Sequence, residues 1–166
     1  MRDAPEIVQQ IADAFAEVPQ PAPDTLVNNH CCECAETSAA YAGKTWTDVT
    51  LEDVLRGRET SLLTATAWRY YLPAFMIWAI RAPESMDVLL DNLVYQLDGA
   101  GVPAWFAERA AGFTDQQRQA ICAYLVWYRD REEIAWARLG AEPPRHVYSA
   151  LAHWSGGAST DSRSAE

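Results

Sequence analysis

Apolar residues recur at helical spacing along most of the chain. Near the start, Val8, Ile11 and Phe15 fall on one face of a 3.6-residue repeat, which is typical of an amphipathic helix. Pro5 suits the first turn of that helix, because an N–H at that position has no partner within the helix. The prolines within 19–23 then end the helix, since each removes a hydrogen-bond donor and restricts the residue before it. The pattern therefore predicts an N-terminal helix followed by an extended connector.

The rest of the apolar pattern predicts a chain made almost entirely of helices. Further helices are expected over 29–41, in a short segment that Thr50 caps with Asp53 three residues on, over 64–80, from Ser85 to Gly99, and over 102–111, 114–139 and 144–154. Pro73 lies inside 64–80 and is expected to divide this segment into two helical pieces. Residues 46–49 form the only stretch with a hint of strand.

The segment 114–139 is expected to be the longest helix. Thr114 and Gln117 have the spacing of a capping box, and Gly140 follows as a stop. Residues 120–128 are apolar nearly all round, so this part of the helix should be enclosed by other helices.

Composition agrees with one domain of ordinary globular type. The chain has 166 residues, of which 49% are hydrophobic, and this size allows a core to form without metals or disulfides. We therefore predict an all-α fold. It should be a single compact multi-helix domain over 1–154, with one long central helix near the C-terminal half. The Gly- and Ser-containing segment 155–166 is predicted to be a disordered tail.

Net charge and the lack of targeting signals indicate which partners and which cellular compartment to expect. The formal net charge of -10 argues against a nucleic-acid partner, which requires a basic face, and favours a basic or apolar protein partner. Residues 1–10 contain no apolar signal region, and the apolar run 70–80 is about half the length of a membrane span. The four cysteines are not spread as a disulfide framework would be. A cytoplasmic protein without membrane association is expected.

The cluster His30-Cys31-Cys32-Glu33-Cys34 is the clearest candidate for chemistry. On a helix, His30, Cys31 and Cys34 share an arc of roughly 100°. Imidazole and thiolate groups are the ligands that zinc prefers, so these three residues are a candidate metal site. The fourth ligand would be water or one of Cys122, His146 and His153.

Two other interpretations of the same cysteines stay open. Cys31 and Cys34 form a C-x-x-C pair, and a helix N-terminus favours the thiolate that attacks disulfides. Against this, the strand-rich surroundings of a thioredoxin-like fold are not predicted. The third interpretation is structural, because small reduced cysteines commonly fill protein interiors.

A second candidate site contains aromatic residues beside a proline. Arg69, Tyr70 and Tyr71 precede Pro73 and, together with Trp46, are a candidate partner surface or pocket. The alternative is a kinked core helix whose tyrosine hydroxyls bind backbone groups.

Several of these segments resemble a bacterial family of uncharacterised proteins, a domain of unknown function. The similarity lies in the His-Cys-Cys-x-Cys run at 30–34, the Trp-Thr-Asp element at 46–48 after Gly43-Lys44, the Tyr-Tyr-Leu-Pro-Ala-Phe segment at 70–75 and the Phe-Thr-Asp-Gln-Gln segment at 113–117. The resemblance covers about residues 5–128, with 129–166 beyond it. It implies a soluble bacterial protein and brings no activity or cofactor.

The phosphate-binding, dinucleotide-binding, serine-hydrolase and zinc-protease motifs are all absent from the sequence. We therefore expect first a non-catalytic cytoplasmic interaction module, of which an immunity- or antitoxin-like protein is one form. The alternative is a zinc-binding protein, structural or hydrolytic, that uses His30, Cys31 and Cys34. The second alternative is a thiol redox protein that uses Cys31 and Cys34.

Overall fold

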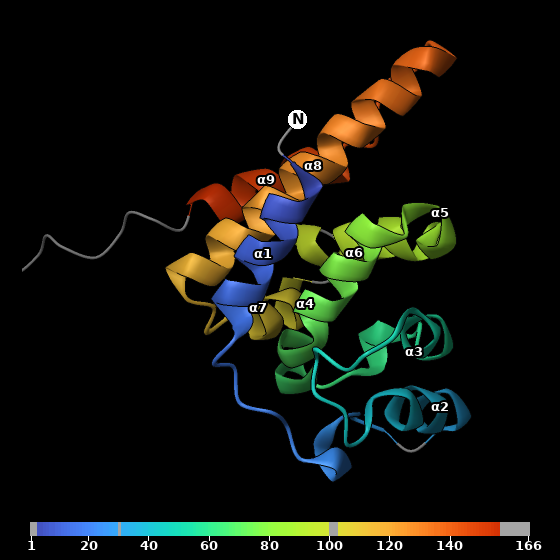
Figure 1. The fold of residues 1–166 in the computed structure, drawn as a ribbon, viewed down its shortest axis with the longest axis vertical. Coiled ribbons are helices and arrows are strands. Elements are labelled where there is room, and N and C mark those ends of the chain that lie inside the picture. The colour runs from blue at the N-terminus through green and yellow to red at the C-terminus, as the bar shows by residue number, and fades with distance from the viewer. Residues whose placement is uncertain (1–2, 30, 100–102, 157–166) are drawn as a thin grey trace, which may run out of the picture.

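The computed structural model describes residues 3–29, 31–99 and 103–156, and within them the fold is all-α (Figure 1). Its α-helices are α1 (Ala4–Phe15), α2 (Cys32–Tyr41), α3 (Leu51–Arg56), α4 (Ala65–Arg81), α5 (Pro83–Met86), α6 (Val88–Asp98), α7 (Pro103–Ala110), α8 (Asp115–Leu139) and α9 (His146–Ser155). Two short 3-10 helices, η1 (Pro23–Thr25) and η2 (Thr60–Leu62), lie between them. The predicted fold class is confirmed.

The helices form two unequal parts around α4. On one side, α8 packs against α1 and α9, while α6 also contacts α9. The helices α2 and α3 pack against each other at the opposite end of the molecule (Figure 1). Residues 46–48 of the segment with a hint of strand form a turn, and the described β-pairing is a single bridge between Val27 and Leu63.

The predicted helix caps of α3 and α8 are confirmed. The Thr50 hydroxyl accepts the N–H of Asp53 at 3.2 Å, and the Asp53 carboxylate accepts the N–H of Thr50 at 3.0 Å. Thr114 and Gln117 make the equivalent reciprocal pair at the start of α8. Each pair satisfies N–H groups that would otherwise lack a partner at a helix start.

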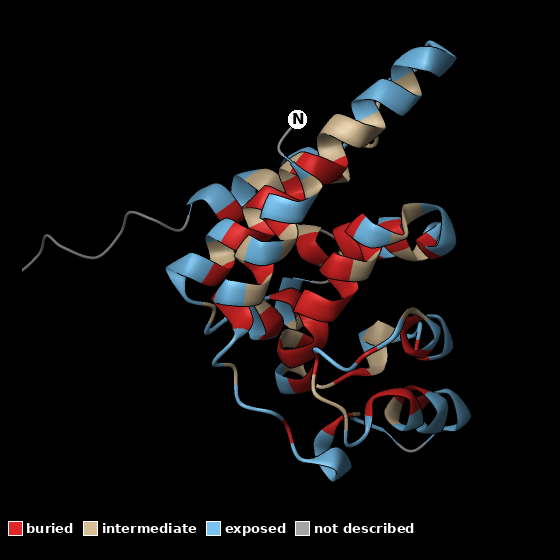
Figure 2. Cartoon of the chain, viewed as in Figure 1, coloured by how far each residue is buried: buried red, intermediate tan, exposed pale blue. Residues whose placement is uncertain are grey.

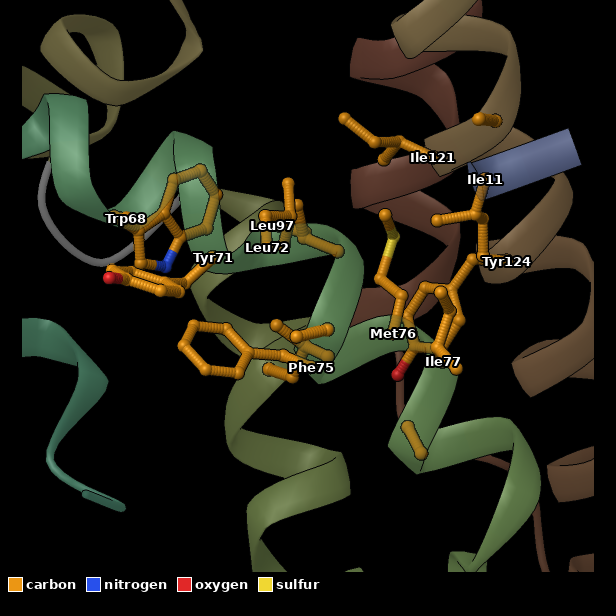
Figure 3. Close-up of a cluster of buried hydrophobic side chains, with 14 of the residues drawn as sticks. Ile11, Trp68, Tyr71, Leu72, Phe75, Met76, Ile77, Leu97, Ile121 and Tyr124 are labelled. Atoms are coloured by element: carbon orange, nitrogen blue, oxygen red, sulfur yellow. The ribbon is translucent and has the colours of Figure 1, made fainter. Parts of the chain in front are cut away.

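The helix α4 runs continuously through Pro73, so the predicted division into two pieces is wrong. A proline inside a helix costs about 3 kcal/mol or more. Here twelve of the seventeen residues are buried, which offsets that cost through apolar burial. Figure 3 shows Met76 and Ile77 of α4 beside Ile11 of α1 and Tyr124 of α8.

No helix in the described ranges is long and apolar enough to cross a membrane.

Two other predicted boundaries also needed correction. The segment after α4 is not one helix capped by Ser85, because α5 ends at Met86 and α6 begins at Val88. Asp87 separates them with a φ of 41°, a conformation that hydrophobic periodicity does not reveal. Most of the predicted tail, 157–166, lies outside the described residues, and Ser155 is the last residue of α9.

The long helix α8 has two distinct halves. Its first half is enclosed as predicted, with Ala120, Ile121, Tyr124 and Leu125 fully buried. Its second half extends away from the other helices and is mostly exposed or half-buried (Figure 2). A helix that projects in this way receives little stabilisation from tertiary packing.

Candidate functional site

The cysteine pair lies where the chain enters α2. Cys31 is the N-cap residue, with extended backbone angles of φ -122° and ψ 172°. Its Sγ accepts a hydrogen bond of 3.1 Å from the backbone N–H of Cys34. The helix begins at Cys32, three residues later than expected, so the pair occupies the cap and the first turn. The unpaired N–H groups and the dipole of a helix N-terminus stabilise negative charge on an atom at the cap.

The two thiols of the pair differ sharply in exposure. Cys31 is exposed, whereas Cys34 is buried with 1% of its surface accessible. The side-chain hydrogen bond between Cys34 and Cys31, together with burial, raises the pKa of the Cys34 thiol. Cys32, on the same turn, is also exposed. The arrangement is an accessible sulfur backed by a protonated, inaccessible one.

Hydrogen bonds from tyrosines fix α2 in place. The Tyr41 hydroxyl, at the end of α2, donates to the carbonyl of Gly57 at 2.9 Å. The Tyr71 hydroxyl of α4 donates in turn to the carbonyl of Tyr41 at 2.9 Å. Burial raises the pKa of Tyr71 to about 12, so this hydroxyl stays a donor at neutral pH. The cysteine pair therefore sits on a helix that is anchored at its far end to the core.

Two of the three predicted zinc ligands, Cys31 and Cys34, lie together at the start of α2. His30 lies outside the described residues, so its part in a site stays a prediction. The described residues contain no group of three His, Cys, Asp or Glu side chains that could hold a metal ion. The candidates for a fourth ligand, Cys122, His146 and His153, belong to α8 and α9, which Figure 1 places away from α2.

The aromatic candidates Trp46, Tyr70 and Tyr71 all lie in the core, at 9%, 4% and 1% exposure. Tyr71 binds backbone carbonyls, as the structural alternative expected. Arg69 is half-buried, and its guanidinium carbon lies 5.8 Å from the ring centroid of Phe113. Three of the four candidates are therefore buried, and their part in a pocket or partner surface stays a prediction.

Sequence reasoning missed a cavity between η2, α6 and α7. Gln96 and Trp105 line it, and a buried arginine, Arg109, lies against the indole of Trp105. These residues come from separate helices and have no shared motif, so only their contacts in the fold reveal the cavity.

Comparison with known proteins identifies one family. The model of a family of unknown function, DUF6714, matches residues 3–149. This range is longer than the resemblance over 5–128 indicated, and it includes the projecting half of α8. No curated protein and no solved structure matches the chain. Because the matched residues make up most of its length, the chain belongs to this family of unknown function, DUF6714.

Proposed function

We propose that Cys31 and Cys34 act as a dithiol that exchanges with disulfides, with Cys31 as the attacking sulfur. The observation that carries this proposal is the N-cap position of Cys31, where its exposed sulfur accepts the N–H of Cys34 at 3.1 Å. The Cys31 sulfur therefore lies against the residue that carries the second thiol. A disulfide between them requires Cα atoms within about 4.4–6.8 Å of each other.

The exchange proceeds in two displacements. The Cys31 thiol first loses its proton to water, and the thiolate attacks one sulfur of a substrate disulfide. The substrate S–S bond breaks, and the leaving thiolate takes a proton from water. Cys34 then loses its proton and attacks the Cys31 sulfur, which releases the second substrate thiol. The substrate disulfide is reduced to two thiols, and Cys31 and Cys34 are oxidised to a disulfide.

The charges near the cysteine pair favour one class of substrate. Glu33 and Glu36 are exposed on α2, and the whole chain carries a formal net charge of -10. Negative charge near the sulfur repels anionic disulfides and attracts cationic ones at low salt. A cationic disulfide is therefore the preferred substrate.

The test compares single-cysteine variants with two small disulfides, cationic cystamine and anionic glutathione disulfide. In Cys34→Ser, cystamine should form a stable mixed disulfide at Cys31, detectable by peptide mass spectrometry. In Cys31→Ser the stable adduct at position 31 should be lost. The wild type should end with a Cys31–Cys34 disulfide. Cys31 should react faster than exposed Cys32, because the N–H of Cys34 holds the Cys31 sulfur in place at the cap of α2.

The matched control is Cys32→Ser, which removes an exposed thiol from the same turn and should leave the reaction unchanged. Equal rates at Cys31 and Cys32, or no Cys31–Cys34 disulfide in the wild type, would contradict the proposal.

Native mass spectrometry of protein purified without chelator provides a separate check. One zinc ion per chain, lost in Cys34→Ser, would favour the zinc site instead.

A second candidate function is a protein-interaction module, favoured by the projecting half of α8. Ile134 and Leu139 are 48% and 75% exposed there. A cavity of about 420 Å³ runs beside this half, lined by Glu84, Trp127, Arg131, Ile134, Ala135 and Arg138. We propose that it docks an apolar helix of a partner protein that carries an acidic side chain, because Arg138 lies beside the apolar residues, whereas Arg131 is already paired with Glu84 at 2.8 Å.

Crosslinked capture from cells tests this docking. A partner held through α8 should be lost in Ile134→Glu and retained in Leu55→Glu, which charges an exposed apolar residue on α3. Capture should also weaken at high salt because charge pairs are screened. Equal loss in both variants, or binding that salt strengthens, would argue against α8 as the docking helix.

A further inference from the structure

The cavity between η2, α6 and α7 has the properties of a ligand site. Its volume is about 320 Å³, at the small end of the range for ligand pockets. Its lining includes Arg58, Glu59, Asn92, Gln96 and Trp105. None of them belongs to the cysteine pair or to the projecting half of α8, so this cavity is separate from both sites described above.

The amide of Gln96 is held in one orientation. Its Oε1 accepts the indole N–H of Trp68 at 2.9 Å, and Trp68 is fully buried. Its Nε2 donates to the Thr60 hydroxyl at 2.9 Å. An indole nitrogen can only donate, so the oxygen of Gln96 must face Trp68. The second N–H of the amide is then left as a preset donor in the cavity wall.

A buried positive charge lies directly behind the same wall. Arg109 is 1% exposed, and its guanidinium carbon is 3.7 Å from the ring centroid of Trp105. It donates to the carbonyls of Ser61 and Leu63, and Ser61 also lines the cavity. Its Nε has no hydrogen-bond partner within the described part of the chain.

None of the ion pairs in the described ranges joins this guanidinium to a carboxylate. Burial lowers the pKa of Arg109 to about 10, so the guanidinium is still charged at neutral pH. An unpaired buried cation is costly, because desolvation is not repaid by a nearby anion. An anion in the adjoining cavity would reduce that cost.

We propose that this cavity binds a small aromatic carboxylate. The ring would lie against the part of Trp105 that Arg109 leaves open. A cation on an indole withdraws negative potential from the ring, which favours an electron-rich or anionic aromatic partner. The carboxylate would accept from the free N–H of Gln96 and from the guanidinium of Arg58, with Asn92 beside them.

Glu59 competes with a bound carboxylate for the guanidinium of Arg58. It pairs with Arg58 at 3.8 Å, and both side chains are more than half exposed. Such an exposed pair contributes little, so a ligand carboxylate can replace Glu59 as the partner of Arg58. Binding should therefore depend on Arg58 and weaken as salt screens the charges.

The experiment uses three probes with one ring and different charges: indole-3-acetate, its neutral amide indole-3-acetamide, and cationic tryptamine. In calorimetric titrations of the full chain, indole-3-acetate should bind about tenfold more tightly than the amide, as expected for one charge-assisted hydrogen bond. Tryptamine should bind more weakly still.

Arg58→Gln should remove the preference for the acid over the amide, while Arg56→Gln should keep it. Arg56 is a matched control because it is an exposed arginine two residues away that does not line the cavity. Trp105→Leu should weaken all three probes. Equal or reversed affinities for the acid and the amide, no detectable binding of any probe, or the same effect of both arginine variants would overturn the proposal.

Discussion

Trp154→Ala is expected to lower the free energy of unfolding by about 3–5 kcal/mol. Trp154 lies near the end of α9 with 2% of its surface exposed. Its indole N–H donates to the carbonyl of Leu97 at 2.8 Å, and its ring packs edge-on against Phe106 and Phe113. Truncation would leave a large cavity and remove the hydrogen bond that the Leu97 carbonyl accepts from the indole, so both lost packing and lost hydrogen bonding contribute.

Chemical denaturation followed by circular dichroism measures this loss. Trp136→Ala is the matched control, because Trp136 is half-buried on the projecting half of α8 and bonds only to the Glu132 side chain. It should cost no more than about 1 kcal/mol. Similar losses for the two variants would mean that α9 does not close the core. Trp154 lies beyond the range 3–149 that the family model matches.

Gly99→Ala should be the second most damaging change tested, and Gly140→Ala provides a close comparison. Both glycines cap a helix with positive φ, at 70° and 67°. In that conformation a side chain costs roughly 1–2 kcal/mol. A Cβ at Gly99 would also meet the ring of Phe106 at 2.3 Å, whereas a Cβ at Gly140 meets nothing within 4 Å. Phe106 is itself buried and cannot easily move away.

The difference between the two variants isolates the steric contribution. Thermal unfolding should show Gly140→Ala losing about 1 kcal/mol and Gly99→Ala losing about 2–4 kcal/mol, because overpacking adds to the backbone cost. Because Gly99 also borders the proposed ligand cavity, probe affinity should fall in Gly99→Ala alone. Equal losses of stability in the two variants would show that the positive φ alone, and not the contact with Phe106, causes the destabilisation.

Local signals in the sequence were enough to predict much of the helical framework. The capping boxes of Thr50 with Asp53 and of Thr114 with Gln117 form as expected, and α8 ends at Leu139, directly before Gly140. These features depend on hydrogen bonds and backbone preferences within a few residues, so they can be recognised without knowledge of the fold. The same locality made Cys31 and Cys34 recognisable as a pair near a helix start.

The sequence by itself determined the all-α class, most helix ends and the candidate cysteine pair, because each is encoded by neighbours along the chain. The tertiary structure alone decided that α4 continues through Pro73 and that Cys34 is buried while Cys31 is exposed. It also placed Arg109 against Trp105 beside the cavity. Burial and contact between distant segments depend on how helices pack, and intrinsic propensity yields to that packing when enough apolar surface is enclosed.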